Sequence, residues 1–237
     1  MATDNAFDIR KIELPPIDLE AVPPRSRRRS WSTRILLTCF GLVTVAVLPF
    51  VVLIRASMYL YTARDVPTWL ALGGGALATT VLLTCCAVWV SKKLHSGARA
   101  RWLGTRVVLP LVLAYCGYTL LYLSSVNAKG TEVRAYYRSL HPILRVAVST
   151  VILVDRDMVV TDVARAGGDY ARMGLPANRA SMHYEQSDGY VHAVDLRTRG
   201  EGWWRNWMVE GYFRAMGFST LRHRGTEDHL HVGLPVH

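Results

Sequence analysis

Cysteine is missing from the whole stretch after Cys116, and its absence restricts what the C-terminal part of this 237-residue chain can contain. The four cysteines of the chain all lie in strongly apolar stretches, at Cys39, Cys85, Cys86 and Cys116. The C-terminal part therefore has neither a disulfide bond nor a zinc site built from cysteine. A cysteine-free domain is compatible with either side of a bacterial membrane.

Acidic residues are missing from residues 92–106, although this stretch carries five basic residues. Residues before 35 carry a further seven basic residues against five acidic ones. From Asn127 onward the chain is close to neutral, with fourteen basic and twelve acidic residues. The basic excess lies beside apolar stretches, where signals of membrane orientation are found. Binding to nucleic acid is not needed to explain the charge, and we expect no nucleic-acid partner.

Three long runs contain almost no charge: Ile35–Ile54, Thr68–Val90 and Val107–Leu123. The first two have the length that a helix needs to cross a hydrocarbon core, and the third is shorter. The first run follows the basic segment Arg25–Arg29 and could be a signal peptide instead. Its length, the lack of a small-residue cleavage site and the two later runs favour an uncleaved anchor. The sequence thus predicts three transmembrane helices, with the lipid bilayer as a partner.

The distribution of basic residues predicts the orientation of these helices. Arginines precede the first run and basic residues fill 92–106, so the positive-inside rule places both segments in the cytoplasm. After three crossings the C-terminal domain lies outside. We expect a disordered cytoplasmic tail over 1–33, a membrane region over 34–126 and an extracytoplasmic domain over 127–237. The expected location is the bacterial inner membrane, crossed several times.

The C-terminal part shows the patterns of a small α+β domain with a mainly antiparallel sheet. Thr131–Leu140 and Trp203–Met216 have helical spacing, and Gly217 stands where a helix ends. In the second helix, the stripe of Trp203, Trp207, Tyr212 and Met216 predicts the side that packs on the sheet. The predicted strands are Arg145–Val154, Met158–Val163, Ala180–Gln186, Tyr190–Leu196, Phe218–Arg222 and His229–Leu234.

Strand alternation predicts which polar side chains share a face of the sheet. If Ser187-Asp188-Gly189 forms a three-residue hairpin loop, His183 lies opposite Ala193 and diagonal to Asp195, on one face. His192 then points to the other face, whereas a two-residue turn would bring His192 beside His183. His229 and His231 are two residues apart and share a face in any register.

Two imidazoles and one carboxylate from separate segments can close three corners of a tetrahedral zinc site. The fourth corner then stays open, which distinguishes a catalytic zinc from a structural one. Asp228 stands near a strand start, where its carboxylate could take a proton during attack on a carbonyl. The same residues are also compatible with ordinary roles. The histidines could be core or surface residues or belong to a solvated polar strand face, and Asp228 could be a turn residue. In that case the domain binds no metal.

The chain resembles the superfamily of lysostaphin-type, D-alanyl-D-alanine and hedgehog zinc peptidases. The D-alanyl-D-alanine branch carries SxHxxGxAxD, followed by an acidic-x-x-His or HxH element. Here Ser181-Met182-His183 and Ala193-Val194-Asp195 match the two ends of the first motif, and Asp228-His229-Leu230-His231 matches both forms of the second. The chain departs from the pattern between His183 and Asp195, where it has eleven residues and the family has six.

The resemblance implies a zinc cofactor with His183, Asp195 and His231 as its ligands. It implies Asp228 as the general base and His229 as a contact to substrate or oxyanion. It also implies an upstream arginine that holds the substrate carboxylate, for which Arg165 is the first candidate and Arg179 the second.

The resulting expectation is a membrane-anchored zinc-dependent peptidase that acts on peptidoglycan stem peptides or cross-links outside the inner membrane. The alternative is a non-catalytic, membrane-tethered zinc or cell-wall-binding module, which the lengthened hairpin favours because it could fill the cleft.

Overall fold

The computed structural model describes residues 31–93, 100–165, 168, 169, 174, 176, 180–225 and 228–235. Most of the predicted disordered tail, and the second arginine candidate Arg179, lie outside these residues. The chain divides into two units, Met1–Val43 and Thr44–His237. The described part of the first unit is the beginning of one helix, and everything that follows concerns the second.

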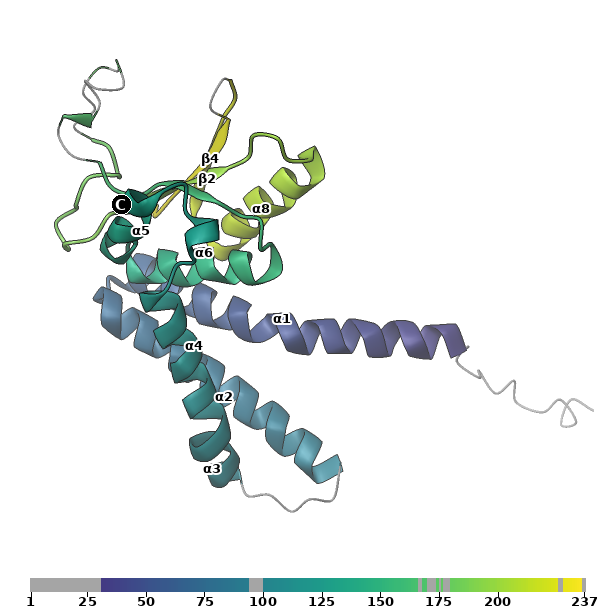
Figure 1. The fold of residues 1–237 in the computed structure, drawn as a ribbon. Coiled ribbons are helices and arrows are strands. Elements are labelled where there is room, and N and C mark those ends of the chain that lie inside the picture. The colour runs from purple at the N-terminus through teal and green to yellow at the C-terminus, as the bar shows by residue number, and fades with distance from the viewer. Residues whose placement is uncertain are drawn as a thin grey trace, which may run out of the picture. The chain divides into compact units, whose positions relative to one another are not determined.

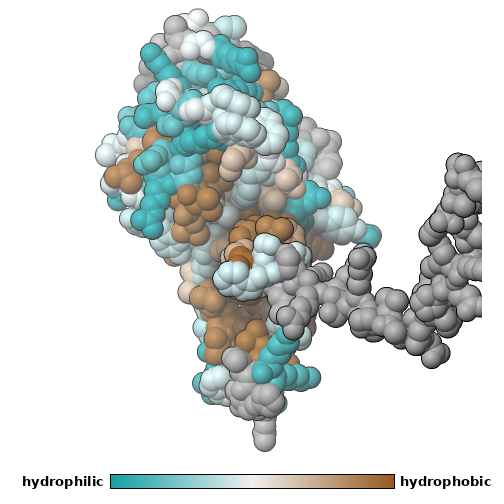
Figure 2. All heavy atoms as spheres, turned by 90° about the vertical axis from the view of Figure 1, so that its right-hand side faces the viewer, coloured by the Kyte–Doolittle hydropathy of each residue, from teal (hydrophilic) through white to brown (hydrophobic). Residues whose placement is uncertain are grey.

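Three helices are long and apolar enough to cross a membrane, as the sequence predicts. They are α1 (Trp31–Arg64), α2 (Thr68–Lys93) and a third that runs over Ala100–Leu121. The third consists of α3 (Ala100–Leu103), a wider helical turn at Gly104–Val108 and α4 (Leu109–Leu121). Apolar side chains gather over the helical part of the surface in Figure 2, and hydrophilic ones over the sheet-bearing domain. The length and apolarity of these helices suggest association with a membrane.

Gly75 marks a close approach between α1 and α2. A Cβ atom built on Gly75 would lie 2.5 Å from the carbonyl oxygen of Leu53 and 2.1 Å from Oγ of Ser57. Small residues let helix backbones approach in this way, and here the backbone itself blocks any side chain. Gly73, two residues earlier in α2, has nothing within 4 Å of the same position.

We therefore expect Gly75→Ala to lower the stability of the full-length protein in detergent by roughly 1 to 2 kcal/mol, because over-packing forces the backbone to move. Gly73→Ala is the matched control and should leave the thermal midpoint unchanged or slightly raised. Equal thermal midpoints of unfolding for the two variants would show that α1 and α2 can move apart at Gly75 without a loss of stability.

The C-terminal domain contains a four-stranded antiparallel sheet with helices, which confirms the predicted fold class (Figure 1). The strand order is β1-β2-β4-β3. The strands are β1 (Val160–Asp162), β2 (Ala193–Arg197), β3 (Ser219–His223) and β4 (His229–Gly233). The helices are α5 (Thr131–Tyr136), α6 (Pro142–Val154) and α8 (Trp203–Met216), with short 3-10 turns at Ser125–Asn127 and Tyr137–Ser139.

The predicted strand at Arg145–Val154 is wrong, because this segment forms the helix α6. Pro142 begins the helix at a position where its missing N–H group is not needed. Every residue from Pro142 to Val151 is buried. The helix is surrounded by protein, so even the face that carries Arg145 and Ser149 is buried, and its run of β-branched residues resembles a buried strand. Figure 1 shows α6 between the membrane helices and the layer that contains the sheet and α8.

The predicted packing side of α8 is right for Tyr212 and Met216 and wrong for the tryptophans, and both ends of the helix are confirmed. Trp203, Trp204 and Trp207 are each at least 58% exposed. The buried side chains of α8 are Asn206, Val209, Phe213 and Met216. Gly217 ends the helix with a φ of 99°, in the left-handed region that suits glycine. The helix thus packs through its smaller apolar residues, and the tryptophans lie on its outer side.

Candidate metal centre

Strands β2 and β4 place two of the predicted ligands directly opposite each other. The register pairs Asp195 with His231 across the two central strands. On β4 the exposure alternates, with His229 and His231 partly exposed and Leu230 and Val232 buried in the core. Nδ1 of His231 lies 2.8 Å from Oδ1 of Asp195. Alternation along β4 therefore turns both histidines away from the core, toward the face that carries Asp195.

The third predicted ligand, His183, arrives from the segment before β2. This segment is not the predicted strand Ala180–Gln186, but a series of turns with a single antiparallel bridge between Glu185 and Val191. The bridge has the register of a three-residue loop at 187–189, as predicted. Nδ1–H of His183 donates to the carbonyl oxygen of Val163 at 2.7 Å, which leaves Nε2 with the lone pair. Nε2 lies 3.3 Å from Oδ1 of Asp195 and 3.2 Å from Nδ1 of His231.

The spacing of these three atoms fits a tetrahedral ion. Two ligands at zinc–ligand distances of roughly 2.0–2.1 Å and a tetrahedral angle are separated by about 3.3 Å. The three separations here are 2.8, 3.2 and 3.3 Å. The Val163 carbonyl supplies the outer hydrogen bond that orients a ligating histidine. His183, Asp195 and His231 thus form a group that could bind a metal ion.

The electrostatics of the group keep Asp195 ionised. Burial alone would raise the pKa of Asp195, which is 3% exposed, but hydrogen bonds from His183 and His231 outweigh it and hold the pKa well below its usual range. Burial would lower the pKa of His183, yet its contacts with Asp195 hold that pKa above its usual value. In the metal-free site, the ionised carboxylate of Asp195 therefore favours the protonated form of the His183 imidazole.

Arg165, the predicted substrate contact, reaches the centre from the segment after β1. Its NH2 group donates to Oδ2 of Asp195 at 3.1 Å, and its Nε donates to Oδ2 of Asp162 at 2.6 Å. The guanidinium thus holds the oxygen of Asp195 that faces away from the two histidines. In this arrangement Arg165 orients a ligand, and its role toward a substrate stays a prediction.

Of the two predicted catalytic residues, His229 lies beside the metal group, whereas Asp228 is held by other side chains. Nε2 of His229 lies 3.7 Å from Oδ2 of Asp195, and its ring stacks on His223 with 4.6 Å between centroids. Asp228 instead accepts a hydrogen bond from Oγ1 of Thr198 at 2.8 Å and pairs with Arg222 at 3.3 Å. Burial would raise the pKa of Asp228, but the contacts with Arg222 and Thr198 together outweigh it and hold the pKa below its usual value. The structure therefore places His229 beside the metal group and fixes Asp228 to its neighbours.

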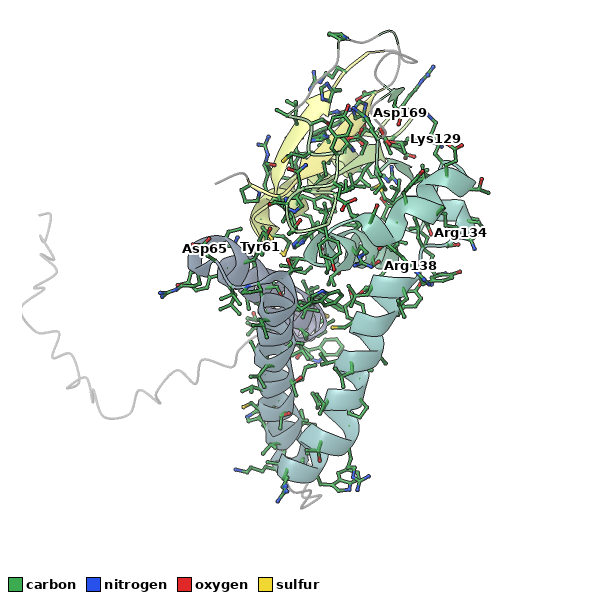
Figure 3. The ribbon with its side chains drawn as sticks, turned by 90° about the vertical axis from the view of Figure 1, so that its left-hand side faces the viewer. Tyr61, Asp65, Lys129, Arg134, Arg138 and Asp169 are labelled. Atoms are coloured by element: carbon green, nitrogen blue, oxygen red, sulfur yellow. The ribbon has the colours of Figure 1, made fainter. Side chains whose placement is uncertain are left out.

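A cavity of about 870 Å³ adjoins the centre. His183 and Arg165 line it together with Lys129 and with residues of α5 that include Glu132. Lys129 and Asp169 are labelled at this side of the domain in Figure 3. The cavity walls thus carry both signs of charge, as a site for a zwitterionic peptide needs. Sequence patterns did not indicate α5 as a wall, because its contact with β1 depends on the tertiary fold.

His192 does not replace His183. Its Nε2 lies 2.9 Å from both carboxylate oxygens of Asp188, in a second group with His141.

Comparison with known proteins gave no relatives. No family model matches the chain, and no match was found among curated proteins or among solved structures. The likeness to zinc peptidases therefore depends on the residues of the metal group alone.

Proposed function

We propose that this protein is a membrane-anchored zinc-dependent peptidase that cleaves peptidoglycan stem peptides or cross-links outside the inner membrane. The observation that carries the proposal is the convergence of His183, Asp195 and His231 within tetrahedral distances beside a large cavity. Two nitrogen ligands and one carboxylate leave a position open, as in catalytic zinc sites. The excess of basic residues around the predicted cytoplasmic loops supports the outward orientation of the domain.

The chain's own residues have distinct parts in this reaction. A bound zinc ion would polarise the scissile carbonyl and make water nucleophilic at neutral pH. Val163 and Arg165 fix the orientation of His183 and Asp195, so the ligands need no rearrangement. His229 stands beside the group, where its imidazole donates a hydrogen bond to the developing oxyanion. Asp228 acts as general base once a substrate draws it from Arg222.

The second candidate is a non-catalytic zinc or cell-wall-binding module. One observation favours it: the Asp228 carboxylate is held by Thr198 and Arg222, with its pKa lowered, and a weaker base accepts protons less readily.

Incubation of the zinc-loaded, full-length protein in detergent with purified muropeptides separates the two candidates. We expect mass spectrometry to show cleaved peptides. We expect Asp228→Asn to reduce turnover by roughly 10²- to 10⁴-fold while zinc content stays the same. Asp157→Asn is the matched control, because Asp157 is an exposed carboxylate in the turn after α6. Intact muropeptides alongside stoichiometric zinc would exclude the peptidase and favour the binding module.

A further inference from the structure

A second group of metal-ligand side chains lies apart from the candidate active centre. It consists of His141, Asp188 and His192, which offer one ligand atom each within 4.8 Å of one another. Oδ2 of Asp188 lies 2.9 Å from Nε2 of His192 and 3.7 Å from Nε2 of His141. The two imidazole rings meet edge to face, with 5.2 Å between centroids.

The fold brings these residues together through a parallel bridge between Leu140 and Val191. The N–H group of Val191 donates to Ser139, and the N–H group of His141 donates to Val191. His141 and His192 directly follow the bridged residues and therefore lie side by side. The hairpin loop at 187–189 then brings Asp188 next to these two histidines.

The group also contacts the end of α1 and the beginning of α2. Oγ1 of Thr68 lies 3.0 Å from Nε2 of His141, and Oη of Tyr61 donates to Oδ2 of Asp188 at 3.4 Å. Trp69 donates to Oη of Tyr190 at 3.1 Å. Figure 3 shows Tyr61 at the end of α1, next to the sheet-bearing domain. The hairpin is thus held against the membrane helices by polar contacts around these ligand atoms.

The charge states in the group suit a cation. His141 is completely buried, and its Nδ1 has no hydrogen-bond partner among the described residues. Burial and the neighbouring His192 lower the pKa of His141 to about 3, so the imidazole is neutral at physiological pH. Asp188 is ionised, because the hydrogen bond from His192 holds its pKa low against the effect of burial. A neutral imidazole and a carboxylate are the forms in which these side chains bind metals.

We propose that His141, Asp188 and His192 form a second binding site for a divalent transition cation of the zinc class. Two imidazoles favour such metals over Mg²⁺ or Ca²⁺, which prefer oxygen ligands. Asp188 is exposed and gives an ion access from solvent. The ion joins the hairpin to His141, the residue before α6, and hydrogen bonds from Tyr61 and Thr68 connect the group to α1 and α2. The same hairpin begins at His183, so occupancy of the second site also restrains a ligand of the first.

The test is metal analysis of the full-length protein in detergent, after loading with Zn²⁺ alone and removal of excess ion. We expect two zinc ions per chain in the wild type. Asp188→Asn combined with His192→Gln should leave one, His231→Gln should also leave one, and the three substitutions together should leave none. Asp157→Asn is the control for the loss of one carboxylate and should keep two. These ligands are at least partly accessible to solvent, and circular dichroism checks that each variant is folded.

The outcomes separate this proposal from the proposed function. One ion in the wild type that disappears with His231→Gln but persists in the Asp188/His192 variant would overturn the second site and leave the first. One ion that disappears only in the Asp188/His192 variant would support the second site and exclude the zinc peptidase.

Discussion

Asp195→Asn will release the metal ion from the candidate active centre and reduce the stability of the metal-free protein. Asp195 supplies the carboxylate of the triad, and its Oδ1 lies 2.8 Å from Nδ1 of His231 and 3.3 Å from Nε2 of His183. Losing an outer hydrogen bond to a ligand already lowers metal affinity by about 10- to 100-fold, so losing a charged ligand should exceed roughly 100-fold. Equilibrium dialysis against zinc buffers measures this change.

The effect on stability arises from the groups that Asp195 leaves behind. Arg165 and His183 both pair with this carboxylate, and it is almost completely buried. Removing one partner of a buried ion pair typically costs about 3–5 kcal/mol, because the other charge stays without compensation. Thermal unfolding in a chelator should therefore show a markedly lower midpoint for Asp195→Asn.

Asp162→Asn is the matched control for both measurements. Asp162 also pairs with Arg165, but it is 30% exposed and does not belong to the triad. We expect this variant to keep its zinc affinity and to lose less than about 1 kcal/mol. Similar zinc affinities for the two variants would contradict the assignment of Asp195 as a ligand.

Acidification will destabilise the protein through His141, and His141→Gln will remove that part of the pH dependence. The pKa of His141 is about 3 in the folded protein and about 6.5 in the unfolded chain. The unfolded chain therefore binds the proton first, and the contribution of neutral His141, complete above pH 6.5, is lost as the pH falls toward 3. The loss amounts to about 2 kcal/mol at pH 5 and about 3 kcal/mol at pH 4.

The comparison between wild type and variant isolates His141 from other groups. Burial, His192 and Arg145 lower the pKa of His141, whereas Asp188 raises it. His183 acts in the opposite direction on stability, because its pKa is raised in the folded state and its contribution is lost as the pH increases. Thermal midpoints of both proteins should be measured between pH 7 and pH 4 in a chelator. A constant difference across that range would contradict a neutral, buried His141.

The sequence predicted most accurately those features that depend on a local period. Alternation placed His229 and His231 on one face of β4, and the resemblance to zinc peptidases implied the triad with Asp195. Both ends of α8 were predicted because helical spacing stops at Gly217, where the backbone enters the left-handed region. The three helices of the described residues that are long and apolar enough to cross a membrane were evident from the sequence.

Other features depend on contacts between segments that are distant in the sequence. The spacing of residues within one segment cannot predict such contacts. The helix α6 is buried on all sides, so its apolar run looked like a strand. His141 meets Asp188 and His192 only because Leu140 pairs with Val191. The salt bridge from Arg165 to Asp195 likewise requires the loop after β1 to pass over the metal group. Sequence spacing alone could not indicate these partners.

Because α6 is buried against the apolar helices, cutting the C-terminal domain away from them would expose apolar surface. This helix contacts α2 and α4 as well as α8, and Tyr115 of α4 hydrogen-bonds to Thr150 of α6 at 2.7 Å. A fragment cut away after the third membrane helix would present this apolar side to water, and we expect it to aggregate. We therefore expect proteolytic shedding to yield no diffusible form of the domain.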